Sequence, residues 1–479
     1  ARVLAISCIG TDCAARLPPE NRYLSIYGNV EIDVFLQLGL YEMTWNNTHD
    51  LALRERAQRV IPGYTGMYGH MSTVLLPDEF PQYFRRGKGA RLWDYDGHEY
   101  VDYMCAFGPN LLGYNHPEVE AAVREQAEQG DTLTGPSERM IEAAELFVSL
   151  VSHAQWALFC KNGTDATSVA IVTARAHTGR RVILAAKGAY HGADPWCVPA
   201  LLSKGTVPED RACIVYYEYN NPQSLTDAFK AHEGDVAAVF ATPFWHETFQ
   251  DQHLPELEFA KTARQLCDET GALLVVDEVR AGFRLARDAS WSLMGIEPDL
   301  TTWGKCFANG HAISAVLGAE RFRQAATEIY VTGSFWFSSV PMAAACATLK
   351  IIRDTDYLER LQGAGEALRA GLAQQAAAHG FVLRQTGPAA MPQILFQDDP
   401  DFRVGYAWVT ECVQRGAYLH PYHNMFLSSA HSLQDIKQTL EATAEAFDVI
   451  RRKRDSLQPS PRLAPLFAMI AQHEATMAE

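Results

Sequence analysis

Short apolar runs alternate with amphipathic stretches through the middle of the chain. The runs resemble strands that are buried on both faces of a parallel sheet. Between them, apolar residues recur at helical spacing, as over Asp165–His177, after Asn221 and over Pro255–Thr270. The predicted strands are Trp156–Cys160, Arg181–Ala185, Ala212–Tyr216, Val236–Thr242, Leu273–Val276 and Asp299–Trp303. This alternation predicts an α/β fold with a mainly parallel sheet and helices on both of its faces.

The segments before this region follow another pattern. Arg91–Tyr103 predicts two strands that turn at Asp96-Gly97, which is a strong hairpin signal. Helices are expected over Asp50–Arg59, from Pro117 onward and over Glu138–Val151.

Long helical patterns dominate from about residue 345 onward, over Ala343–Asp354 and Asp356–His379. Two strand-like segments follow, and Ser432 with Asp435 three positions later forms a capping-box pair at the start of a last helix. We therefore expect residues 1–105 to be an N-terminal part of a small domain, residues 106–345 a large domain, and residues 346–479 a C-terminal small α+β domain.

Composition narrows the class of protein. The 57 acidic residues against 41 basic ones give a formal charge of −16, which disfavours nucleic acid or anionic membranes as partners and is compatible with a cationic ligand. The ten cysteines show no CxxC pair and no zinc spacing, so we expect reduced thiols and no metal site. No apolar stretch has the length of a signal peptide or a membrane span, and a cytoplasmic location is expected.

Candidate chemistry lies at the end of the Leu273–Val276 run. Asp277 and Glu278 follow it at the carboxyl end of the predicted strand, where open α/β sheets bind ligands. Lys305 comes just after the Asp299–Trp303 strand. A lysine amine beside a carboxylate suits a Schiff base with an aldehyde cofactor whose ring nitrogen the acid keeps protonated. Considered one at a time, either acid could be an ordinary capping or loop residue, and the lysine could be an ordinary surface charge.

Two upstream segments extend this set. Asn162-Gly163-Thr164 stands where a strand passes into a helix, and the helix start suits a phosphate monoester, although a simple N-cap fits as well. Tyr190-His191, between glycines, could lie on a flat ring or form an ordinary turn. A phosphate seat, a stacking tyrosine, an acid and a lysine in this order match the needs of pyridoxal 5′-phosphate.

The chain resembles class III aminotransferases of fold type I, most closely their glutamate-1-semialdehyde aminomutase-like branch. The resemblance is carried by Ala90–Tyr103, Asn162–Arg175, Gly188–Gly192, Leu274–Arg284 and Pro298–Lys305. It implies a large domain with a mainly parallel, seven-stranded type of sheet and a smaller α+β domain. It also implies a homodimer with the active site at the interface.

The resemblance assigns roles to individual residues. Lys305 is the implied catalytic, Schiff-base lysine, and Asp277 the implied partner of the pyridine nitrogen. Val279 packs on the ring face opposite Tyr190. The other implied cofactor-binding residues are Asn162, Gly163 and Thr164 at the phosphate, His191 beside Tyr190, and Ser334, whose hydroxyl reaches the phosphate of the neighbouring subunit.

Three departures from the family bear on the substrate. The loop Tyr64–Met71 has no arginine to clamp a substrate carboxylate, aromatic residues follow Ser334, and Thr242-Pro243 replaces Glu-Pro. We therefore expect Tyr68, His70 and Trp336 to contact a cationic, polyhydroxylated substrate.

The resulting hypothesis is an aminotransferase that moves an amino group between a small-molecule amino donor and a carbonyl acceptor. The expected substrate is an amino sugar, at a position of the aminoglycoside 6′ type, in antibiotic biosynthesis. An epimerase or aminomutase acting on the same kind of substrate, and a binding protein that only retains the fold, are alternatives.

Overall fold

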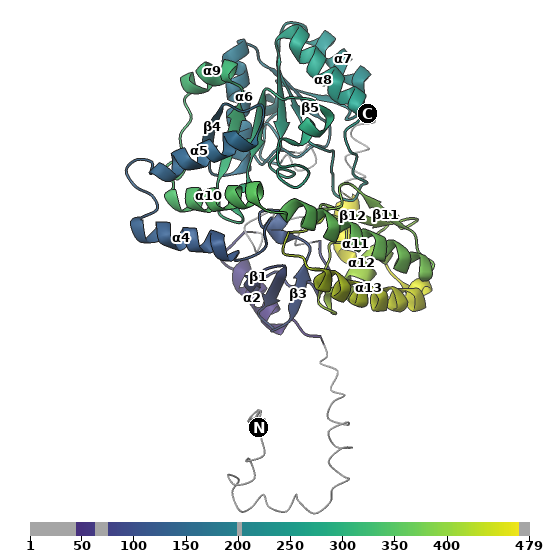
Figure 1. Ribbon diagram of the computed structural model, residues 1–479. Helices are drawn as coiled ribbons and strands as arrows, with labels where there is room; N and C mark the ends of the chain where they lie inside the picture. The colour runs from purple at the N-terminus through teal and green to yellow at the C-terminus, as the bar shows by residue number, and fades with distance from the viewer. Residues whose placement is uncertain (1–44, 63–74, 199–203, 469–479) are drawn as a thin grey trace, which may run out of the picture. The chain divides into compact units, whose positions relative to one another are not determined.

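The computed structural model describes residues 45–62, 75–198 and 204–468. A seven-stranded sheet has the strand order β4-β10-β9-β8-β7-β5-β6 (Figure 1). The strands from β9 to β6 run parallel, and β10 runs antiparallel to both of its neighbours. The strands are β4 Trp156–Cys160, β5 Val182–Ala186, β6 Ile214–Tyr217, β7 Val236–Ala241, β8 Leu273–Asp277, β9 Leu300–Trp303 and β10 Ser314–Gly318. The predicted mainly parallel sheet is confirmed, whereas β10 was not predicted.

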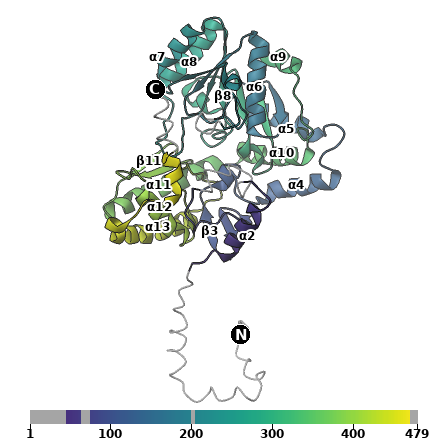
Figure 2. The same cartoon turned by 180° about the vertical axis from the view of Figure 1, so that it is seen from behind.

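Alternating side chains of each strand enter opposite cores, as the pleat of a strand requires. Leu273 and Val275 of β8 pack on the side of α6 (Gly163–Thr178), whereas Leu274 and Val276 pack against α7 (Pro222–Ala231) and α8 (Leu257–Thr270). Figures 1 and 2 show these helices on the two faces of the sheet. All five residues of β8 are buried, which explains the continuous apolar run in the sequence.

A second, four-stranded sheet has the order β1-β2-β3-β13. Its strands are β1 Phe84–Lys88, β2 Arg91–Asp94, β3 Glu99–Asp102 and β13 Ala417–Tyr418. Strands β2 and β3 form the predicted hairpin. Strand β13 pairs in parallel with β3, so this sheet joins segments from both ends of the described chain.

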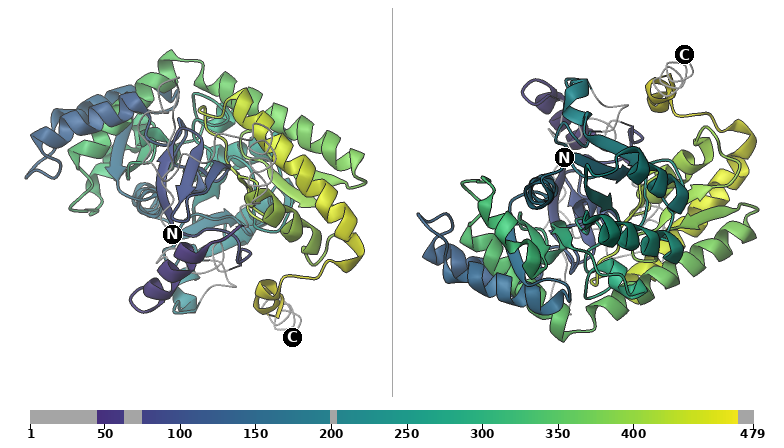
Figure 3. Two further views of the ribbon diagram at one scale, coloured as in Figure 1. Left: turned by 90° about the horizontal axis from the view of Figure 1, so that it is seen from below. Right: turned by 90° about the horizontal axis from the view of Figure 1, so that it is seen from above.

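Helices dominate the C-terminal part, as predicted. Helix α13 (Leu433–Lys453) begins with the expected capping box, in which Asp435 Oδ2 accepts a hydrogen bond from Ser432 N at 2.9 Å. It runs beside α11 (Tyr357–Ala378), as Figure 3 shows. The remaining helices and strands are α2 Thr48–Gln58, α4 Pro117–Gln129, α5 Glu138–Leu150, α9 Arg323–Glu328, α10 Ser339–Asp354, α12 Arg403–Val413, β11 Leu383–Thr386 and β12 Gln393–Phe396.

None of the helices in the described ranges is long and apolar enough to cross a membrane. The division at residues 105 and 345 stays a prediction.

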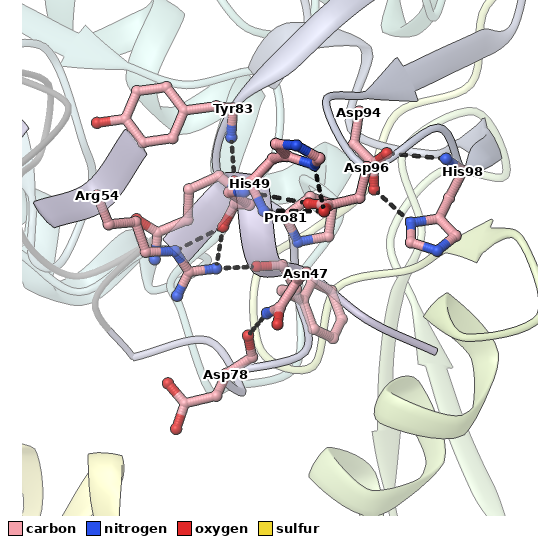
Figure 4. A network of polar contacts seen from close by, with 12 residues as sticks. Asn47, His49, Arg54, Asp78, Pro81, Tyr83, Asp94, Asp96 and His98 are labelled. Carbon is pink, nitrogen blue, oxygen red and sulfur yellow. Dashed lines mark hydrogen bonds and ion pairs between the residues drawn. The ribbon is translucent and has the colours of Figure 1, made fainter. Parts of the chain in front are cut away.

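A polar network that is exposed at His49 and buried at Asp50 fixes α2 against the hairpin (Figure 4). The carboxylate of Asp96, in the hairpin turn, accepts hydrogen bonds from the backbone amides of His49 and Asp50 in the first turn of α2. The fully buried carboxylate of Asp50 in turn binds Arg54 Nε at 2.6 Å and the amide of Tyr83 at 2.9 Å. The start of α2 is therefore held by charge as well as by packing.

Replacing Arg54 with alanine is expected to lower the free energy of unfolding by about 3 kcal/mol or more, because the buried carboxylate of Asp50 then loses its counter-charge. Urea denaturation measures this change. Arg56, exposed on the same helix, is the matched control, and its replacement with alanine should cost about 0.5 kcal/mol or less. Equal costs for the two variants would contradict a structural role for the ion pair.

Candidate active site

Lys305 lies where β9 ends and a short 3-10 helix, η7 (Lys305–Ala308), begins. Its backbone has φ of +49°, a conformation that is unfavourable for a residue with a side chain. Such strain persists only where the surroundings impose it, and it is common at functional sites. The side chain faces a pocket at the carboxyl end of the parallel strands, where ligands bind in this class of sheet.

Asp277, the last residue of β8, lines the same pocket and is held by three hydrogen bonds. Its Oδ1 accepts from the Thr302 hydroxyl at 2.8 Å and from the Val279 amide at 3.1 Å. Its Oδ2 lies 2.8 Å from His191 Nδ1, which donates because a carboxylate only accepts. The carboxylate is thus buried, oriented and able to accept one more hydrogen bond, as from a protonated ring nitrogen.

The start of helix α6 forms the third side of the pocket. A methyl group on Gly163 would lie 2.6 Å from Val279 Cγ1, and one on Gly192 would lie 2.6 Å from Thr164 Oγ1. Both glycines are therefore required by close packing of pocket residues. The first amides of α6 have no partner within the helix, so they and the Thr164 hydroxyl suit a phosphate group.

The pocket brings together most of the predicted residues. Gly163, Thr164, Tyr190, His191, Asp277, Val279 and Lys305 all line it. Asn162 does not, since its side chain is exposed while its carbonyl accepts a 2.6 Å hydrogen bond from Ser314. The cofactor-binding roles of all these residues stay predictions.

Ser334 and Trp336, which are predicted to serve the neighbouring subunit and the substrate, do not line the pocket of their own chain. Ser334 is exposed in a turn outside the pocket of its own chain. Trp336 folds over Gly333 and packs against the hydrophobic core on the α6 side of the sheet. Tyr68 and His70 lie outside the described residues.

Sequence reasoning missed part of the site. Thr302, Arg280 and His246 all contribute, Thr302 by orienting Asp277 and the other two by lining the pocket. Thr302 and Arg280 lie within segments that carry the family resemblance. Their closeness in the sequence to Lys305 and Asp277 is a signal that could have identified them as site residues. The departure from Glu-Pro at Thr242-Pro243 points to this segment, but the sequence alone does not place His246 in the same pocket as Lys305.

The environment of Lys305 adjusts its amine for chemistry at neutral pH. Its pKa is lowered from the usual 10.5 to about 7, mainly by burial and next by the positive charge of Arg280. A neutral amine is the form that attacks a carbonyl carbon and accepts protons. Together with the oriented carboxylate of Asp277 and the start of α6, it fits pyridoxal phosphate.

Because the pKa of Lys305 is lowered, cofactor-free protein is expected to react with pyridoxal phosphate at a rate that rises about tenfold per pH unit and levels off near pH 7. Below that pH the amine is mostly protonated and does not attack. Stopped-flow absorbance over pH 5 to 10 measures the rate, with the amine of a free lysine derivative as the reference. A rate that continues to rise up to pH 10 would contradict the lowered pKa.

Comparisons with known proteins show the family to which the chain belongs. The model of the family described as aminotransferase class-III matches residues 77–450. An aminopentol aminotransferase from Sphingopyxis macrogoltabida is 64% identical over 421 residues, which are 88% of this chain and 99% of that protein. A glutamate-1-semialdehyde 2,1-aminomutase from Sulfurihydrogenibium azorense is 32% identical over 77% of this chain and 92% of that protein.

The solved structure of the FumI protein of Sphingopyxis sp. MTA144, in its PLP internal aldimine form, has the same fold with a TM-score of 0.85 and 64% identity. The match covers 87% of this chain and 100% of that one. The family resemblance, the fold type I architecture and the cofactor predicted from the sequence are therefore confirmed. This chain belongs to the class III aminotransferases and is a pyridoxal-phosphate-dependent aminotransferase.

Proposed function

We propose that this aminotransferase takes its amino group from a polyhydroxylated amine that carries no carboxylate beside the amine, and passes it to a carbonyl acceptor. The observation that carries the proposal is the 64% identity with an aminopentol aminotransferase along 99% of that protein. The name aminopentol denotes an amine with five hydroxyl groups. A relative this similar over its whole length is expected to share its substrate class.

The wall of the pocket supports such a substrate. It follows β7 and consists of Thr242, Pro243, Phe244 and His246, of which none carries a fixed charge. The Thr242 hydroxyl is used within the wall, where it donates to the carbonyl of Phe244 at 2.9 Å. In addition, the segment 64–71 contains no arginine that could form a bidentate clamp on a carboxylate.

The residues of the site have distinct tasks in this reaction. When bound, pyridoxal phosphate supplies a ring that withdraws electrons from the carbon bearing the nitrogen. Lys305 Nζ would bind the cofactor aldehyde, then act as a free base that takes the proton from the substrate carbon and returns it. Asp277 would accept a hydrogen bond from the ring nitrogen, with Thr302 and His191 keeping its carboxylate in place.

The test uses purified holoenzyme, a polyhydroxylated long-chain amine as donor and pyruvate as acceptor. We expect alanine to form with this amine and much more slowly with glutamate as donor. If α-amino acids convert the cofactor and the polyhydroxylated amine does not, the proposed donor class is contradicted. Formation of an isomer of the amine over many turnovers without any acceptor would instead favour the epimerase or aminomutase considered above.

The amino sugar expected from the sequence belongs to the same chemical class of polyhydroxylated amines. No observation favours an aminoglycoside 6′ position or a role in antibiotic biosynthesis over the aminopentol type of donor. A cytoplasmic location remains part of the proposal.

We also propose a homodimer in which Ser334 reaches the phosphate bound by the other copy. In support, Ser334 is exposed and does not line the pocket of its own chain. Light scattering of the holoenzyme tests the dimer, and a monomer with full activity would contradict it.

A further inference from the structure

The loop that follows β7 is fixed on several sides. Backbone hydrogen bonds of 2.8 and 3.0 Å pair Trp245 with His253, and the Trp245 indole donates to the carbonyl of Lys187 at 2.8 Å. Phe249 stacks on Tyr422 with ring centroids 4.2 Å apart, and its amide donates to the Tyr422 carbonyl. The residue between these anchors, His246, is therefore held in one position.

His246 lines the pocket together with Lys305 and is 8% exposed. Its Nδ1 lies 3.3 Å from the carbonyl of Phe244. Since a carbonyl can only accept, Nδ1 carries the hydrogen. In the neutral ring Nε2 then has a lone pair, and Nε2 has no hydrogen-bond partner in the described part of the chain. A buried acceptor without a partner is destabilising and calls for a donor from outside the protein.

The surroundings keep this ring neutral. Burial lowers the pKa of His246 well below its usual 6.5, and the positive charge of Arg280 acts in the same direction. A neutral ring with hydrogen on Nδ1 offers only an acceptor at Nε2. Carboxylates, phosphates and ketones offer only acceptors and do not pair with it. A hydroxyl group does, because it can donate.

We propose that His246 is a specificity-determining residue that accepts a hydrogen bond from a hydroxyl group on the carbon next to the reacting amine. The preferred substrates are then vicinal amino alcohols. This inference rests on the proposed function and narrows it, because it specifies where one hydroxyl of the polyhydroxylated amine must lie.

The test compares two probes, a straight-chain vicinal amino alcohol and the matched amine without the hydroxyl group. Each is mixed with the holoenzyme in the absence of an acceptor, and the cofactor spectrum gives the dissociation constant and the rate of the first half-reaction. In the wild-type protein the amino alcohol should bind about tenfold to a hundredfold more tightly than the matched amine. In His246→Phe and His246→Leu this ratio should fall to near one, mainly through the dissociation constant.

Two further variants sharpen the result. His246→Gln keeps an acceptor oxygen and should retain part of the preference. His253→Phe changes an exposed histidine of the same loop, outside the pocket, and should keep the wild-type ratio. Thermal unfolding identifies any variant that fails to fold, and His246→Leu and His246→Phe serve as alternatives in that case.

Several outcomes would overturn the inference. Equal weakening of both amines, or an unaltered ratio in both apolar variants, excludes hydroxyl recognition by His246. A shift of the cofactor absorption before any amine is added, with both amines affected alike, would place His246 against the cofactor. If the wild-type protein reacts with α-amino acids and with neither amine, the proposed function itself fails.

Discussion

Replacing Lys305 with alanine is expected to slow the conversion of the cofactor by amines by at least about 10⁴-fold. Two functions are lost together, because the same amine holds the cofactor aldehyde and moves the proton. Two other basic side chains in the described part of the pocket are poor substitutes, because Arg280 is always protonated and the pKa of His246, well below 6.5, makes it a weak base. A single-turnover experiment with the holoenzyme and an amine, followed by absorbance, measures the loss.

Lys230→Ala is the control for this experiment. Lys230 is exposed in the last turn of α7 and lies outside the pocket, so its loss should leave the rate within about twofold of wild type. Recovery of activity in Lys305→Ala upon addition of small primary amines would support the assigned role. Undiminished single-turnover rates in that variant would refute it.

Replacing Asp277 with asparagine is expected to slow the same half-reaction by about 10²- to 10³-fold. The amide keeps the shape of the side chain but removes the negative charge that a protonated ring nitrogen requires. The bond from the Thr302 hydroxyl can remain, whereas the 2.8 Å bond from His191 to Oδ2 is disturbed. Spectra recorded from pH 5 to 9 should also show weaker protonation of the ring.

Thr302→Val separates charge from orientation. It removes one hydrogen bond to Asp277 Oδ1 but leaves the charge and the bonds from Val279 and His191. The Thr302→Val replacement should therefore slow the half-reaction by about tenfold or less. If the two variants slow the reaction equally, orientation and not charge is the contribution of Asp277.

The fold could be predicted where each strand is buried on both faces. Leu273–Val276 is apolar throughout because both neighbouring layers of helices cover it, and that pattern is visible in the sequence. Strand β10 was missed, because Ser314–Gly318 is short, begins with serine and ends with glycine. Strand β13 consists of two residues, and only its partner β3 defines it as a strand.

The site could be predicted to the extent that its residues stand at strand ends. Asp277 ends β8, whereas Lys305 and Gly163 come just after β9 and β4, and the carboxyl ends of these strands meet at one edge of the sheet. The contact between His191 and Asp277 joins residues 86 positions apart and depends on the path of a loop. His246 owes its place to a loop anchored by an indole and a stacked ring, and no local pattern encodes such anchors.

The pairing of β13 with β3 has a consequence for how the protein is made. Residues 101–102 emerge from the ribosome about 300 residues before their partners at 417–418. Until then one edge of the smaller sheet stays uncovered, and exposed edges favour wrong association. A nascent chain of this enzyme is thus expected to depend on chaperones until residues 417–418 have been synthesised.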